Sequence, residues 1–307
     1  MSATALSQPD PAEPAAPAGA PPPFGRTWGS DRRAVLEGLK RRIAEAEERA
    51  WTPLSRAEPP WTTGDARIDR ALGRPLPARG LMELKGAGFA DGPAALGLAL
   101  ALLSRLPAAE DGRRDILWCA PSGHFSECGT PYGPGLQAAG IDPARLVVAA
   151  PKKSAHALWA MEEGLRSGAF RAVLGAAPET GIVESRRLAL SARELATPLL
   201  LMTGSESTTA VSAAARWRVK SALAATDPYD PRSPDRPRIE ARLERWPGRP
   251  PATFLIDLPH GEPDAEDPAA ARRLRLVSEL PDRAASTRQP SEGDGPFGQL
   301  LTFKRCH

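Results

Sequence analysis

Between residues 61 and about 223 the chain alternates short apolar runs with longer segments of helical pattern. This alternation constrains the fold more than any other feature, because continuous apolar strands separated by helices are typical of a parallel sheet covered on both faces. We expect strands at 81–84, 115–120, 145–149, 172–175 and 198–203, and helices at 66–72, 92–106, 154–167 and 184–196. The sequence therefore predicts a doubly wound α/β core over residues 61–223.

The sequence pattern changes after this core. Residues 224–237 are dense in proline and predict a turn-rich loop. Residues 238–283 contain runs in which apolar and charged residues alternate, the period of a half-exposed antiparallel strand. The expected strands lie at 238–246, 252–258 and 272–280. We therefore expect antiparallel strands to extend the sheet on its C-terminal side.

The two ends of the chain differ from the core in composition. Residues 1–26 are rich in proline and alanine and are expected to be disordered, because they cannot bury enough apolar surface to offset the entropy of ordering. Residues 27–60 hold a predicted amphipathic helix and a linker, with Leu36, Leu39 and Ile43 on one helical stripe. A stripe of this kind is a candidate surface for binding a partner.

Residues 284–307 are polar and rich in glycine and proline, and we expect a flexible tail. The tail carries a small apolar cluster, formed by Phe297, Leu300, Leu301 and Phe303. Apolar segments outside a domain commonly bind partners by helix-in-groove packing or strand addition. The tail is therefore a second candidate partner-binding element.

Charge and cysteine content narrow the class of protein. Forty basic and 37 acidic residues leave a net charge of +3, which is no electrostatic footprint for direct binding of nucleic acid. Three cysteines without framework spacing favour a reducing compartment. The N-terminus lacks the pattern of a signal peptide, and the apolar run 94–103 is too short to span a bilayer. We expect a soluble cytoplasmic protein with no membrane partner.

The stretch from Glu83 to Leu103 has the layout of a phosphate-binding loop, with an apolar strand, then glycines, then an apolar helix. A working loop reads G-x-x-x-x-G-K-[ST], in which the lysine neutralises phosphate charge and the hydroxyl binds Mg²⁺. Here the motif is degenerate at Gly86, Gly88, Asp91, Gly92, Pro93 and Ala94.

Each departure from the motif removes part of its chemistry. Asp91 stands in place of the second glycine, unless one residue is inserted and Gly92 takes that role. Pro93 then replaces the lysine and Ala94 the Ser/Thr. A carboxylate among the phosphate oxygens, together with the lost ammonium, opposes nucleotide binding. The sequence predicts no bound cofactor at this loop.

The residues around the loop are similar to those of the bacterial RecA recombinases. The resemblance lies in "TTGDARIDRALGRPLPARGLMELKG" (62–86), "ARLVVAAPKKSAHALWAMEEGLRSGAFRAVLGAAP" (144–178) and "SRRLALSARELATPLLLMTGS" (185–205). It implies a RecA-like arrangement of the α/β core.

Within that superfamily the chain resembles more closely the ImuA family, the damage-inducible mutagenesis accessory proteins found with ImuB. The stretches that carry this likeness are "YGPGLQAAGIDPARLVV" (132–148), "ALWAMEEGLRSGA" (157–169), "SRRLAL" (185–190), "RWRV" (216–219) and "RRLRLVSELPDR" (272–283). They extend the likeness over most of residues 61–283.

The superfamily's other catalytic positions are also changed in this chain. Gly175 and Ala176 stand where an aspartate that directs Mg²⁺ would be expected, and Glu127 is too far along the chain to serve as the water-activating glutamate. The segments 176–184 and 204–212 fill the places of the DNA-binding loops but carry no lysine or arginine. We therefore expect no ATP hydrolysis and no recombinase-like grip on DNA.

Several further residues could be functional by type, but the sequence favours a structural role for them. The stretch "ARWRVK" (215–220) predicts an edge strand with Trp217 packed inward and its arginines outward. Cys119, His124 and Cys128 lack the spacing of a zinc site, so no metal is expected. Trp159 is expected to pack on the sheet.

The ImuA resemblance implies a non-catalytic adaptor in SOS-induced, error-prone translesion synthesis. Its implied partners are ImuB, an error-prone C-family DNA polymerase and RecA, with DNA reached only through the complex, so that the protein is nucleoid-associated when induced. One alternative is an ATP-binding RecA paralogue acting in DNA repair, in which Lys85 replaces the missing ammonium. Another is an SOS inhibitor of cell division, a class that also resembles RecA without a phosphate loop.

Overall fold

The computed structural model describes residues 34–38, 41, 45, 59–107, 115–207, 213–226, 229–230, 232–259 and 273–280. The chain divides into two compact units, residues 1–45 and 46–307. In the first unit the described residues are helical, and Arg41 and Glu45 form an ion pair one helical turn apart (3.9 Å).

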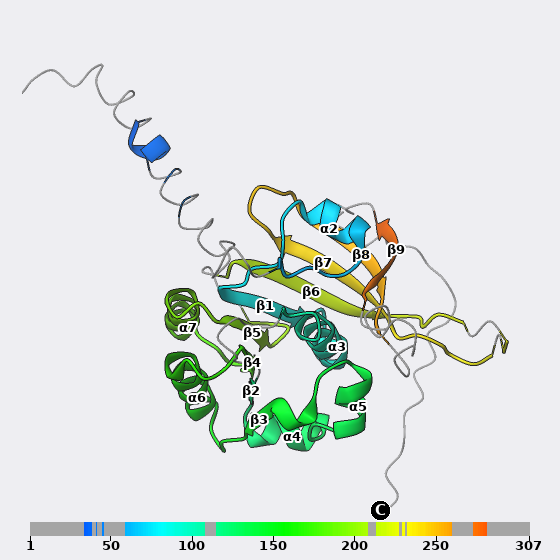
Figure 1. Cartoon of the computed structure of the whole chain (residues 1–307), viewed down its shortest axis with the longest axis horizontal. Coiled ribbons are helices and arrows are strands. Elements are labelled where there is room, and N and C mark those ends of the chain that lie inside the picture. The colour runs from blue at the N-terminus through cyan, green and yellow to red at the C-terminus, as the bar shows by residue number, and fades with distance from the viewer. Residues whose placement is uncertain are drawn as a thin grey trace, which may run out of the picture. The chain divides into compact units, whose positions relative to one another are not determined.

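A nine-stranded sheet forms the centre of the second unit (Figure 1). Its spatial order is β3-β2-β4-β5-β1-β6-β7-β8-β9. The strands are β1 (Gly80–Gly86), β2 (Ile116–Cys119), β3 (Leu146–Ala149), β4 (Ala172–Ala176), β5 (Pro198–Thr203), β6 (Ala215–Ala222), β7 (Arg238–Arg245), β8 (Ala252–Asp257) and β9 (Arg275–Leu280). Neighbours from β3 to β6 are parallel, and β7, β8 and β9 are added antiparallel.

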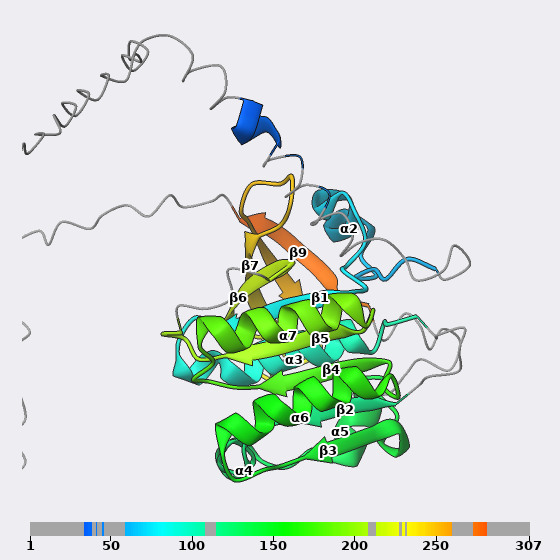
Figure 2. The same cartoon turned by 90° about the vertical axis from the view of Figure 1, so that its left-hand side faces the viewer.

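Helices cover both faces of the parallel part. They are α3 (Gly92–Leu103), α4 (Ser122–Cys128), α5 (Gly133–Ala138), α6 (Ser154–Ser167) and α7 (Ile182–Glu194), with the 3₁₀ turns η1 (Phe89–Asp91) and η2 (Pro143–Arg145). Helix α2 (Ala66–Leu72) lies on the antiparallel side instead, where Nε1 of Trp246 donates to the carbonyl of Leu72. Helices α6 and α7 lie on the near side of the sheet in Figure 2, with α3 behind it. Buried side chains of α6 and α7 form one apolar cluster with the sheet, and those of α2, α3, α4 and α5 form a second cluster on the opposite face. The predicted α/β fold, mostly parallel with antiparallel strands on its C-terminal side, is confirmed.

Single elements follow the sequence prediction to different degrees. Helices α2 and α6 have the predicted bounds, whereas α3 stops at Leu103 and α7 begins two residues early, at Ile182. Helices α4 and α5 were not predicted, because six or seven residues with interspersed glycines show too little periodicity.

The prediction of an edge strand at 215–220 is wrong. Strand β6 lies inside the sheet, parallel to β1 on one side and antiparallel to β7 on the other. Trp217 is buried as expected, but Arg216 and Arg218 form ion pairs with Glu83 and Glu244. The alternating pattern resembles that of an edge strand because one face of β6 carries charges that neighbouring strands neutralise.

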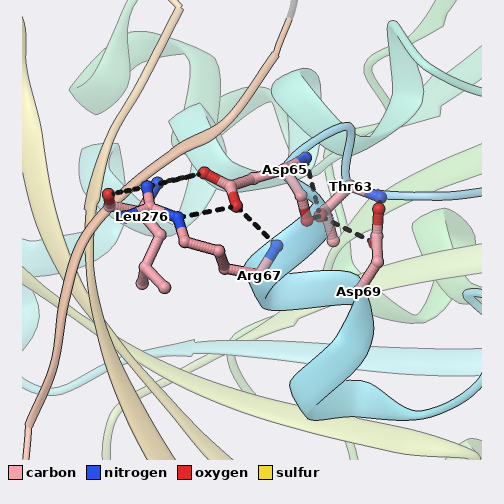
Figure 3. A network of polar contacts seen from close by, with 5 residues as sticks. All are labelled: Thr63, Asp65, Arg67, Asp69 and Leu276. Atoms are coloured by element: carbon pink, nitrogen blue, oxygen red, sulfur yellow. Dashed lines mark hydrogen bonds and ion pairs between the residues drawn. The ribbon is translucent and has the colours of Figure 1, made fainter.

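Hydrogen bonds join α2 to the last strand, β9 (Figure 3). Asp65 caps α2 by accepting from the N–H of Arg67, and its other oxygen accepts from the N–H of Leu276 (2.8 Å each). The guanidinium of Arg67 bonds both Asp65 and the Leu276 carbonyl. Burial alone would raise the pKa of Asp65, but these hydrogen bonds lower it to about 2. The start of the core and the end of the sheet are thereby joined.

No helix in the described ranges is both long and apolar enough to cross a membrane.

Candidate functional site

The candidate site is the turn between β1 and α3. Gly86 ends the strand, and a Cβ atom there would lie 2.8 Å from the carbonyl oxygen of Gly88, closer than real Cβ contacts allow. The N–H of Ala87 donates to the carbonyl of Val219 on β6 (2.7 Å). Glycine is therefore required at position 86 by the tightness of the turn, and the turn is fixed to the neighbouring strand.

The carboxylate of Asp91 lies inside this turn. One oxygen accepts from the N–H of Gly88 (3.0 Å) and the other from the N–H of Ser221 (2.8 Å), the residue next to the end of β6. Burial alone would raise the pKa of Asp91, but the hydrogen bonds from Ser221 and Gly88 lower it below its ordinary value of 3.8. The turn thus carries its own anion, bound to two backbone donors.

The first turn of α3 lacks the groups that bind a nucleotide. Pro93 lies in the first helical turn and has no N–H, and Ala94 packs partly buried against the core. Phe89, at the tip of the turn, has 88% of its surface exposed. The turn therefore presents an aromatic ring where the motif would supply an ammonium and a hydroxyl.

Lys85 does not compensate for the missing lysine in this structure. It lies within β1 on the face opposite Leu84. Its ammonium donates a hydrogen bond to the carbonyl of Ser207, and burial lowers its pKa. The side chain that the alternative hypothesis requires is thus engaged on the other side of the sheet.

A buried polar cluster lies beside Lys85. Glu83 is completely buried and accepts from the hydroxyl of Thr203 on β5 (2.9 Å) and from Nε of Arg216 on β6 (2.6 Å). Both carboxylate oxygens are used, which is what a charge buried at this depth requires. The cluster joins three adjacent strands and has a structural explanation.

Gly175 and Ala176, where the RecA resemblance leads us to expect an aspartate, are packed against neighbouring side chains. A Cβ atom at Gly175 on β4 would lie 2.5 Å from the sulfur of Met161, which packs from α6. Ala176 is buried in the apolar cluster on the other face. Sequence reasoning identified the missing carboxylates, but only the structure shows that Met161 occupies the space at position 175.

Large apolar side chains are exposed just after the carboxyl ends of three parallel strands. Phe89 follows β1, Ile182 and Val183 follow β4, and Leu223 follows β6. Their exposed fractions run from 46% for Ile182 to 92% for Leu223. No sequence motif marks these residues, although the carboxyl edge of a parallel sheet is where α/β proteins usually bind ligands.

Only some of the other predicted site residues lie in the part of the chain that the structure describes. Leu36 is helical, with 47% of its surface exposed. Leu39, Ile43 and the tail residues Phe297, Leu300, Leu301 and Phe303 lie outside the described residues. Cys119 is buried in β2, where burial raises the pKa of its thiol to about 12. A grouping of three or more metal-ligating side chains is not found within the described ranges.

Comparisons with known proteins give structural similarity only at a weak level for the solved structure described here. No family model and no curated protein matches the chain. The crystal structure of SulA from Pseudomonas aeruginosa matches with 22% identity and a TM-score of 0.33, covering 40% of this chain and 97% of that one. A likeness at this level assigns no function to the chain.

Proposed function

We propose that this protein is a non-catalytic adaptor in DNA-damage-induced, error-prone translesion synthesis. It binds ImuB, an error-prone C-family DNA polymerase and RecA, and it reaches DNA and the nucleoid through that complex. The resemblance of residues 61–283 to the ImuA family supports the pathway. The structure supports the absence of catalysis through one observation in particular, the position of Asp91.

Asp91 opposes phosphate binding in two ways. Its carboxylate already accepts hydrogen bonds from the N–H groups of Gly88 and Ser221, so these donors are not available to phosphate oxygens. Its carboxyl, whose pKa lies below the ordinary 3.8, is negatively charged at neutral pH and repels a phosphate. A nucleotide would have to displace the carboxylate without a lysine to offset the charge.

The exposed apolar side chains favour a protein partner at the same edge. Phe89, Ile182, Val183 and Leu223 follow three parallel strands whose carboxyl ends lie at one edge of the sheet, and large exposed apolar side chains there are available to a protein partner. Phe89 in the turn supplies an aromatic side chain, a type enriched at protein interfaces.

Calorimetric titration of the full chain with Mg²⁺–ATP separates the adaptor from an ATP-binding paralogue. We expect no binding heat, and a RecA recombinase in the same buffer serves as the positive control. Micromolar binding that disappears in Lys85→Ala would support the paralogue instead.

Co-purification tests the partners. The full chain should retain purified ImuB, deletion of residues 284–307 should abolish retention, and deletion of residues 1–26 is the matched control. The shortened chain should still melt cooperatively. Retention of the division GTPase in place of ImuB and RecA would indicate a cell-division inhibitor, and normal ImuB binding by the shortened chain would exclude the tail as its binding element.

A further inference from the structure

Strand β3 is one edge of the nine-stranded sheet (Figure 2). It pairs only with β2 among the described strands, so its other side presents backbone donors and acceptors. Val147 and Val148 point to opposite faces and are 45% and 44% exposed. The strand itself, Leu146–Ala149, contains no charged residue.

The opposite edge of the sheet is protected differently. Strand β9 carries Arg275 and Glu279 as exposed charges, a usual device against edge-to-edge pairing. Because β3 has no such charge within it, its edge is suited to pairing with another strand.

An apolar groove runs beside β3. A cavity of about 510 Å³ is lined by Ala149, Ala150, Pro151, His156, Trp159 and Ala160. The expectation that Trp159 packs on the sheet is wrong, because 62% of its surface is exposed. Val147 and Ala149 share the face of the sheet that α6 covers. A strand added to β3 would therefore lie beside the indole ring.

The charges flanking β3 are complementary under two-fold symmetry. Asp142 before the strand and Lys152 after it are both exposed, and Val147 lies midway between them in sequence. Suppose that two β3 strands pair antiparallel with Val147 of one copy opposite Val147 of the other. Asp142 of each copy then lies at the same end of the paired strands as Lys152 of the other copy. Arg145 has its own partner in Asp115 (3.4 Å). The edge thus complements itself.

We propose that two copies of this chain associate through β3, paired antiparallel across a two-fold axis at Val147. Because the two-fold axis is perpendicular to the sheet, both α6 helices lie on the same face of the joined sheet. Each Trp159 therefore covers the line along which the two β3 strands pair. Pairing shields Val147 and Val148 and supplies hydrogen-bond partners to both strand edges. The assembly requires neither a nucleotide nor the partners proposed above.

Sedimentation velocity of the full chain at increasing concentration tests the association. Wild type should sediment as a dimer, and Val147→Lys should weaken the dimer at least about tenfold, because it places like charges at the axis. Trp159→Ala should weaken it as well. The matched control is Val277→Lys, an exposed valine on the opposite edge strand β9 that should leave dimerisation unchanged. Melting temperatures establish that all variants are folded.

Charge reversal tests the register. Asp142→Lys and Lys152→Asp should each weaken the dimer, and the double variant should restore it. A wild-type chain that stays monomeric at every concentration overturns the proposal. The proposal is also overturned if Val147→Lys leaves the dimer as stable as in wild type, or if the double charge-reversal variant does not restore dimerisation.

Discussion

At the scale of single residues, Asp91 decides what the turn after β1 can do. Its two oxygens connect Gly88, three residues earlier, with Ser221, 130 residues later. One side chain therefore closes the turn, fixes it to the end of β6 and gives the site a negative charge. A glycine at this position could do none of these, which is why this degenerate loop is a structural element of its own.

Replacing this residue gives a stability prediction. Asp91→Ala should lower the free energy of unfolding by about 1–3 kcal/mol, because two backbone donors lose a charged acceptor. Urea denaturation measures the change. Phe89→Ser in the same turn is the control and should stay within about 0.5 kcal/mol, since its ring is almost fully exposed.

The variant should still fail to bind Mg²⁺–ATP in calorimetry, because Pro93 and Ala94 remain. An Asp91→Ala chain as stable as wild type would contradict the role assigned to the carboxylate.

At the scale of elements, the contact between α2 and β9 holds the last strand of the sheet. Asp65 is at once the N-cap of α2, the partner of Arg67 and the acceptor for the N–H of Leu276 (Figure 3). Strand β9 pairs only with β8 within the described sheet, so this second attachment matters more than it would for a central strand.

The pKa of Asp65 predicts a pH dependence. The folded pKa of about 2 lies below the ordinary value of 3.8, so the contribution is complete above 3.8 and is lost as the pH falls through about 2. Asp65→Asn should keep the helix cap but cost about 1 kcal/mol at pH 7, once solvent screening is allowed for, and should flatten stability between pH 2 and 4.

Urea denaturation across this range measures the effect, and hydrogen exchange at Leu276 should accelerate in the variant. Asp230→Asn, which changes an exposed carboxylate that accepts from the N–H of Arg232 in a surface turn (3.0 Å), is the matched control. Unchanged exchange at Leu276 would show that the contact does not hold β9.

At the scale of the whole molecule, one sheet joins the parallel core to the antiparallel strands. Strand β6 is parallel to β1 and antiparallel to β7, and a single apolar cluster runs from Trp61 through α3 to Leu276. The described strands consequently share one core, and we expect them to unfold together.

Truncating a residue on one of the added antiparallel strands tests this cooperativity. Phe254 on β8 is 1% exposed and packs near Trp217, with ring centroids 6.1 Å apart. Phe254→Ala should cost about 3–5 kcal/mol and should lower hydrogen-exchange protection in β2 and β4 as much as in β7. Leu223→Ala, at a 92% exposed side chain, is the control. Separate transitions for the two parts would contradict a shared core.

The sequence allowed much of the local structure to be predicted. The helical pattern between apolar runs predicted α6 at Ser154–Ser167 and α2 at Ala66–Leu72. The structure shows Asp65 and Gly73 capping the two ends of α2. The degenerate loop was identified from the residue types alone. The alternating pattern of β6 predicted a strand correctly but misplaced it at an edge, because periodicity reports which faces are buried and not which strands are neighbours.

Local patterns and side-chain chemistry were enough to predict the class of fold, most of the elements and the departure from a phosphate-binding loop at Pro93 and Ala94. The folded chain adds what these patterns could not show: Asp91 bonds to Ser221, Met161 fills the space at Gly175, and Trp159 is exposed beside the edge strand β3. These depend on contacts between residues far apart in the chain, which long-range packing sets and a linear pattern does not encode.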